Sequence, residues 1–142
     1  MKPEDWDARA ARTLAEIARF DRILGDWQGA GEAHGLATKG VLSVRRILDG
    51  SIVEAAERTG DHEDRCYYRF EPEQGGFVVL HMLGGALFRE HPVEFTAEGF
   101  VWINPPGEPT VEWVVTPDGL RCDVRWPSDD LPEVRTFWTR AP

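Results

Sequence analysis

The sequence predicts a mostly β protein, an antiparallel up-and-down barrel of about ten strands preceded by one N-terminal helix. Three observations predict it: an amphipathic helical pattern near the start, short alternating segments through the rest, and turn residues between those segments. So many short strands normally close on themselves, because closure removes exposed strand edges. A two-sheet sandwich is the alternative architecture.

The chain has the size and composition of one globular unit. Its 142 residues fit a single domain over 1–142, with the helix at about 4–20 and the barrel at about 26–140. Hydrophobic residues make up 42% of the chain, and 6 Trp and 7 Phe supply large rigid faces. Such faces suit a packed core or the wall of an apolar pocket.

The first element is predicted as an amphipathic helix. Pro3 is tolerated in a first helical turn, and Glu4 and Asp5 suit the positive end of the helix dipole. Apolar residues then recur at helical spacing, at Trp6, Ala10, Leu14 and Ile17. We expect the helix to end between Phe20 and Gly25 and to close the barrel.

From residue 26 onward the chain reads as short strands rich in β-branched and aromatic residues. The predicted strand segments are 26–33, 38–48, 51–60, 64–70, 76–83, 86–90, 92–97, 99–103, 109–116, 119–126 and 133–140. Asp-Gly turns separate some of them, at Leu48–Ser51 and at Thr116–Gly119. These segments give about nine to eleven strands with short connections.

The segment 119–126 shows the cleanest alternation. Its apolar positions are Leu120, Cys122, Val124 and Trp126, and its charged positions are Arg121, Asp123 and Arg125. We therefore predict a strand with one buried face and one face in water.

Charge and the absence of targeting patterns narrow the partners. A net charge of −9 repels phosphate backbones, so we expect no nucleic-acid partner. The acidic start does not fit a signal peptide, and no segment approaches the roughly 20 apolar residues of a membrane span. We therefore expect a cytoplasmic protein without membrane insertion. In that compartment Cys66 and Cys122 are predicted to be free, buried thiols, and no metal site or cofactor is expected.

The most informative motif is Gly25-Asp26-Trp27-Gln28-Gly29-Ala30-Gly31, at the passage from the helix into the first strand. Here the chain resembles the calycin superfamily, the lipocalins, fatty-acid-binding proteins and their relatives. The pattern Gly-x-Trp-x-Gly-x-Gly looks most like bacterial lipocalin-like families of uncharacterised function and nitrobindin-type barrels. As a nucleotide motif it is weak, because a phosphate-binding loop should follow a strand and open a helix.

The resemblance implies a structural contact between the two ends of the barrel. In calycins the first-strand Trp packs against an Arg or Lys of the last strand, which implies a Trp27–Arg140 clamp here, with Arg135 as the alternative. Nitrobindin-type barrels hold haem through a His near the C-terminus. The last His of this chain is His91, so we do not expect haem to bind in that way.

Three polar residues interrupt apolar stripes and are candidate ligand contacts. Arg46 shares a face with Leu42 and Val44, and its charge must be paired, either by an acidic ligand or by an internal salt bridge, unless that face points outward. His81 and Tyr68 lie on apolar faces in the same way, as core residues or as ligand anchors.

The aromatic residues Trp102 and Trp113 complete the expected ligand-binding set. The remaining histidines, His34, His62 and His91, fall near predicted turns or strand ends and are expected at the surface. The run Asp61–Asp64 is interpreted as a solvated loop.

These observations support three hypotheses. The first is binding, without catalysis, of a small hydrophobic or amphipathic molecule, such as a carboxylate, inside the barrel. The second is an enzyme on the same fold, because calycin-like barrels include isomerases, cyclases and decarboxylases, with His81 and Tyr68 as candidate acid and base. The third is an interaction protein whose barrel is filled by its own side chains. A homodimer is compatible with each.

Overall fold

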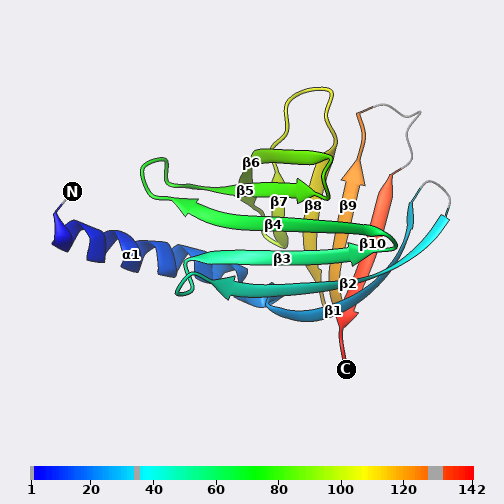
Figure 1. The fold of residues 1–142 in the computed structure, drawn as a ribbon, viewed down its shortest axis with the longest axis horizontal. Helices are drawn as coiled ribbons and strands as arrows, with labels where there is room; N and C mark the ends of the chain where they lie inside the picture. The colour runs from blue at the N-terminus through cyan, green and yellow to red at the C-terminus, as the bar shows by residue number, and fades with distance from the viewer. Residues whose placement is uncertain (1, 34–35, 128–132) are drawn as a thin grey trace.

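The protein is a closed antiparallel β-barrel of ten strands with one N-terminal helix, as the sequence predicts (Figure 1). The computed structural model describes residues 2–33, 36–127 and 133–142. Helix α1 (Pro3–Ile17) continues into the 3-10 segment η1 (Ala18–Ile23). The strands are β1 (Gly25–Ala33), β2 (Leu36–Ile47), β3 (Ile52–Thr59), β4 (His62–Glu71), β5 (Gly76–Leu83), β6 (Leu87–Phe95), β7 (Gly99–Trp102), β8 (Thr110–Thr116), β9 (Gly119–Arg125) and β10 (Val134–Arg140).

Each strand pairs with its neighbour in sequence, and β1 pairs with β10 to close the ring. This arrangement fits a calycin-like fold. Among the described residues, no helix is long and apolar enough to cross a membrane.

Strand β6 corrects one sequence boundary. The sequence predicts two strands here, at 86–90 and 92–97, and Pro92 cannot donate a hydrogen bond within a sheet. They form one strand, in which the Pro92 carbonyl accepts a hydrogen bond from the Ile103 N–H at 2.8 Å. The Pro92 nitrogen, which carries no hydrogen, faces the same side as this carbonyl, just beyond the end of β7. The absent donor therefore falls where the pairing of β6 with β7 already stops.

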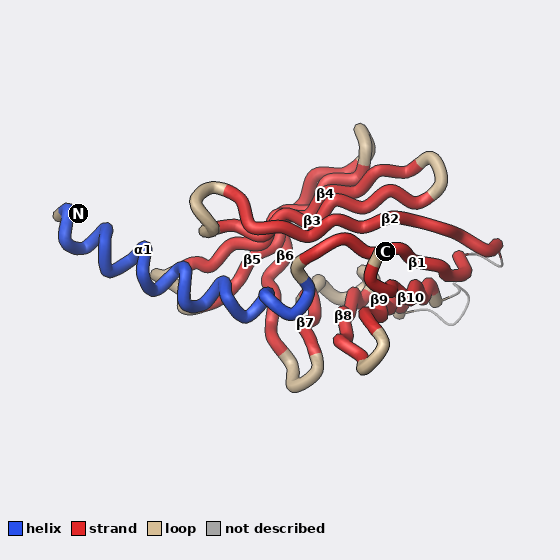
Figure 2. Tube along the Cα trace, turned by 90° about the horizontal axis from the view of Figure 1, so that it is seen from below, coloured by secondary structure: helices blue, strands red, loops and turns tan. Residues whose placement is uncertain are grey.

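Helix α1 begins with Pro3 in its first turn, and the Asp5 carboxylate accepts a hydrogen bond from the Lys2 N–H at 3.3 Å. Its first part extends beyond the barrel (Figures 1 and 2), and Trp6 and Leu14 remain 64% and 41% exposed. The expectation that the helix closes the barrel therefore holds only for its C-terminal end and for η1.

Three apolar residues of this junction, Ile17, Phe20 and Ile23, are buried. The Phe20 ring lies in an aromatic cluster with ring centroids 4.9 to 5.5 Å away, formed with Tyr68, Phe77, Phe95 and Phe100. Packing of this density excludes water. The cluster thus fills one end of the barrel, which we call the helix end.

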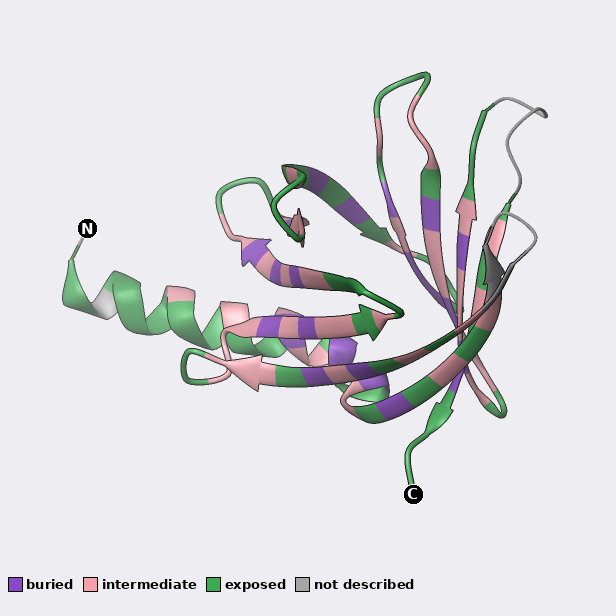
Figure 3. Ribbon diagram, turned by 45° about the vertical axis from the view of Figure 1, so that its right-hand side comes forward, coloured by how far each residue is buried: buried purple, intermediate pink, exposed green. Residues whose placement is uncertain are grey.

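Buried and exposed positions alternate along the strands (Figure 3). The largest fully buried side chain, Trp138, packs against two glycines. A Cβ at Gly29 would collide with the Trp138 ring, and a Cβ at Gly40 would crowd it. Gly29 is the cross-strand partner of both Gly40 and Trp138. Of the glycines of the entry motif, Gly29 is therefore explained by close packing against an indole.

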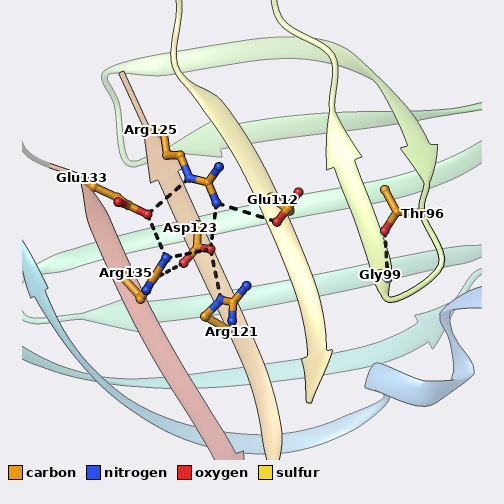
Figure 4. A network of polar contacts seen from close by, with 8 residues as sticks. All are labelled: Thr96, Gly99, Glu112, Arg121, Asp123, Arg125, Glu133 and Arg135. Carbon is orange, nitrogen blue, oxygen red and sulfur yellow. Dashed lines mark hydrogen bonds and ion pairs between the residues drawn. The ribbon is translucent and has the colours of Figure 1, made fainter. Parts of the chain in front are cut away.

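Asp123 corrects the predicted wet face of β9. Its neighbours Cys122 and Val124 do face the interior, but Asp123 is only 1% exposed. It is covered by arginines on the outer surface: Arg135 Nε lies 2.7 Å from its Oδ1, and Arg121 Nε lies 3.0 Å from its Oδ2 (Figure 4). Burial raises the pKa of Asp123, but the hydrogen bond from Arg135 and the charge of Arg121 outweigh it, so the net pKa is lowered.

Candidate functional site

A cavity of about 500 Å³ occupies the barrel interior beyond the aromatic cluster of the helix end. Its lining comes from β2 to β9 and from the connection between β7 and β8. The apolar part of the lining includes Leu42, Ala55, Leu83, Leu87, Val111, Trp113, Val124 and Trp126. An interior packed at ordinary density leaves no void of this size, so the barrel is hollow at this end.

Trp102 forms one wall of the cavity and is itself 6% exposed. Two histidines contact its ring: His91 stacks on it at 5.3 Å and 16°, and His81 meets it at 5.1 Å and 60°. Its indole N–H donates to the Tyr68 hydroxyl at 3.2 Å. These contacts fix the Trp102 ring, so the wall is rigid.

Three polar side chains of the lining come from neighbouring strands, β3, β4 and β5. Glu57 and Asp64 are direct cross-strand partners in the β3–β4 hairpin. His81 Nε2 lies 3.0 Å from Asp64 Oδ1, and these two side chains are 16% and 26% exposed. Glu57, Asp64 and His81 are called the acidic group below.

The Glu57 carboxyl of the acidic group has a raised pKa. Burial is the main cause that raises the pKa of Glu57 to about 8, and the negative charge of Asp64 and a hydrogen bond to it add to the effect. At neutral pH the Glu57 carboxyl is therefore mostly protonated. This arrangement can accept a cation, donate a hydrogen bond or exchange a proton.

The cavity rim holds an ion pair. Arg89 Nη1 lies 2.6 Å from Glu108 Oε1, in the connection between β7 and β8. Arg89 is the one Arg or Lys among the described lining residues, and its charge is already paired. The unpaired charge of the described lining is therefore negative.

Two cysteine thiols face the cavity, Cys66 and Cys122, and both are free. Burial is the main cause that raises the pKa of each thiol well above its usual value. The thiolate is the nucleophilic form, so these groups act as small apolar surfaces at neutral pH.

His91 corrects the expected surface position of the later histidines. It lies within β6 and is 7% exposed, while His62 at the start of β4 is exposed and His34 lies outside the described residues. Burial is the main cause that lowers the pKa of His91, and the nearby His81 adds to it. His91 is therefore a neutral ring in the cavity wall at pH 7.

The structure brings together three of the five residues expected to contact a ligand, Trp102, Trp113 and His81. Tyr68 lies beneath the cavity, buried, with its hydroxyl accepting from Trp102. Burial raises the pKa of its phenol well above the usual value. Tyr68 and His81 are thus not placed side by side in the lining as an acid and a base.

Arg46 lies at the helix end and does not line the described cavity. Its Nε donates to the Gly50 carbonyl at 3.0 Å and its Nη2 to the Leu14 carbonyl at 3.2 Å, and its Nη1 lies 3.6 Å from Asp21 Oδ1. These contacts, with two backbone carbonyls and the half-exposed Asp21, hold Arg46 at the helix end. The expected carboxylate clamp is therefore not in the described cavity.

Trp27 and Arg140 are in contact at the junction of η1, β1 and β10. Arg135, the alternative partner, binds Asp123 on the outer surface instead. Both observations agree with the structural contact that the resemblance implies.

Sequence reasoning identified His81 but missed the two carboxyls of the acidic group, although the signal was present. Glu57 alternates with Val53 and Ala55, the same pattern that drew attention to Arg46. Asp64 is in line with Cys66, but its position in an acidic run suggested a loop. It belongs to β4, whose first residue is His62.

Within the described ranges, no group of three or more His, Cys, Asp or Glu side chains is arranged to hold a metal ion. In comparisons with known proteins, no family model matches the chain and no curated protein sequence matches it.

Proposed function

We propose that the protein binds a small, largely apolar molecule in the hollow end of its barrel. The observation that carries this proposal is the cavity of about 500 Å³ with apolar walls and one polar side. Small-molecule sites are typically about 300–1,000 Å³ and combine such walls with a few polar groups that orient the ligand.

The arrangement of the barrel supports binding over the filled-barrel alternative. The aromatic cluster around Phe20 closes the helix end. Trp102 and Trp113 line the cavity beyond that cluster. A protein that served only as an interaction surface would gain stability by filling the void, since empty volume costs packing energy. Binding is also favoured over an acid–base pair of His81 and Tyr68, because Tyr68 lies beneath the lining.

A matched pair of variants tests the proposal. Ala55 is buried and lines the cavity, whereas Ala56 follows it on the outer face of β3. Titration with the neutral dye N-phenyl-1-naphthylamine should give a saturable rise in fluorescence. Ala55→Phe should weaken the dye by about tenfold or more, and Ala56→Phe should leave it unchanged. Equal affinities for both variants, with both folded by circular dichroism, would contradict binding in this cavity.

A further inference from the structure

We propose that the preferred ligand is an amphipath with a protonated amine, whose ammonium group binds between the Glu57 and Asp64 carboxyls in the cavity lining. This inference rests on the proposed function and adds the chemistry of the ligand's polar end. It differs from the carboxylate expected from the sequence, because the cation that would hold a carboxylate, Arg46, lies elsewhere.

The geometry of the hairpin brings both carboxyls to one point. Glu57 and Asp64 are direct partners across β3 and β4, and such partners have Cβ atoms about 4.5–5.5 Å apart. Both side chains line the same cavity. One ammonium group can therefore donate to both carboxylates at once.

The charge of the described lining selects a cation. Three carboxyl groups line the cavity against one guanidinium, and Arg89 is paired with Glu108. The remaining pair, Glu57 and Asp64, has no Arg or Lys side chain of the described lining beside it to neutralise it. A carboxylate ligand would bring a further negative charge to these carboxyls, whereas an ammonium compensates negative charge.

Other groups face Glu57 from the neighbouring strands. On β4 and β9 they are the Cys66 and Cys122 thiols, whose pKa values are raised by burial. On β5 the group is His81, bonded to Asp64, and on β2 the cross-strand partner is apolar Leu42. Arg58 and Glu63 pair with each other at the exposed surface.

The exchange of a proton for a cation keeps the charge of the site constant. When the ammonium binds, the Glu57 O–H bond breaks and its proton passes to solvent. The cation takes the place of the proton beside the carboxylate, so one positive charge replaces another. Because the pKa of Glu57 is raised to about 8, this release occurs at neutral pH.

The test compares octylamine, 1-octanol and octanoate, which share one apolar chain, by isothermal titration calorimetry. Near pH 7, octylamine should bind about tenfold or more tightly than octanol, and octanoate should bind most weakly. Titrations in buffers of different ionisation enthalpy should show release of about one proton per octylamine, falling as the pH rises above about 8, and none for octanol.

Variants assign the effect to the acidic group. Glu57→Gln and Asp64→Asn should each reduce octylamine to the affinity of octanol, and Glu57→Gln should abolish proton release. Glu54→Gln is the matched control, because Glu54 lies on the same strand but pairs with Arg65 on the outer side, and it should change neither quantity.

The outcomes separate this inference from the proposed function. Equal affinity for octylamine and octanol, or an octylamine preference that survives Glu57→Gln and Asp64→Asn, would overturn the amine site while leaving the cavity as a binding site. Failure of the neutral dye and of all three octyl compounds to bind would overturn the proposed function itself.

Discussion

The guanidinium carbon of Arg140 lies 4.0 Å from the centroid of the Trp27 ring, its direct cross-strand partner. The indole N–H of Trp27 donates a hydrogen bond to the Ile23 carbonyl oxygen at 2.9 Å. Arg140 also donates to two carbonyls of the same junction, from Nη2 to Arg22 at 3.3 Å and from Nη1 to Leu24. One side chain of the last strand thus joins β10, β1 and the end of η1.

Removal of this contact should weaken the fold and spare the cavity. Arg140→Ala loses the cation–π contact and the hydrogen bonds to backbone, so the free energy of unfolding should fall by about 1–2 kcal/mol. Urea denaturation measures the loss, and Lys39→Ala, at an exposed position of β2, serves as the control. Dye affinity should remain unchanged, and a parallel loss of dye binding would mean that the clamp shapes the cavity.

The Arg46 contacts predict a structural role at the helix end. Arg46→Met keeps much of the apolar stem but removes the bonds to Leu14, Gly50 and Asp21, so stability should fall by about 1 kcal/mol. Hydrogen exchange should quicken over the end of α1 and η1. Octanoate and octanol should bind as they do to the unchanged protein, and a selective loss of octanoate would restore Arg46 as a carboxylate contact.

Asp123 predicts a dependence of stability on acid. Its pKa is lowered in the folded protein, so its stabilising contribution is present above the pKa of an unfolded Asp and is lost as the pH falls through the lowered value. Asp123→Asn should reduce the free energy of unfolding by about 2–3 kcal/mol at pH 7. The difference should shrink near pH 2–3, and Asp118→Asn, in an exposed turn, should show no such pattern.

The raised pKa of Glu57 predicts the opposite dependence of stability on pH. Its folded pKa is raised from 4.5 to about 8, so the protein is most stable below the lower value and loses stability as the pH rises through the higher one. Glu57→Gln should therefore raise the free energy of unfolding by about 1–3 kcal/mol near pH 9 and have little effect near pH 4. Chemical denaturation across this pH range checks the difference. If the free energy of unfolding depends on pH in the same way for the two proteins, the raised pKa of Glu57 is refuted.

Local patterns were sufficient to predict the fold. The alternation in 119–126 and the turn at Thr116–Gly119 depend on neighbouring residues, and both are present in the structure. The missed strand continuity at Pro92 depends on where another strand, β7, ends, which no local pattern records. The burial of Asp123 likewise depends on Arg135, which comes from the adjacent strand.

The site was harder to predict. Alternation of apolar and polar residues shows which face of a strand a side chain is on, but not how far along the barrel axis it lies. Arg46 and His81 both interrupt apolar stripes, yet Arg46 reaches the helix end and His81 the cavity. Glu57 and Asp64 become a pair only when the β3–β4 register is known. The expectation that aromatic residues line the cavity agrees better with the structure, since Trp102 and Trp113 are both in the lining.

The closure of the barrel through β1 and β10 also constrains how the chain reaches its folded state. Strand β1 is made before β10, and eight strands separate the two partners along the chain. Until β10 pairs with it, β1 has an open edge, and contacts between such distant segments form slowly because a long loop must first close. An unclosed sheet is prone to pairing with other chains, and the β1–β10 pairing removes that open edge.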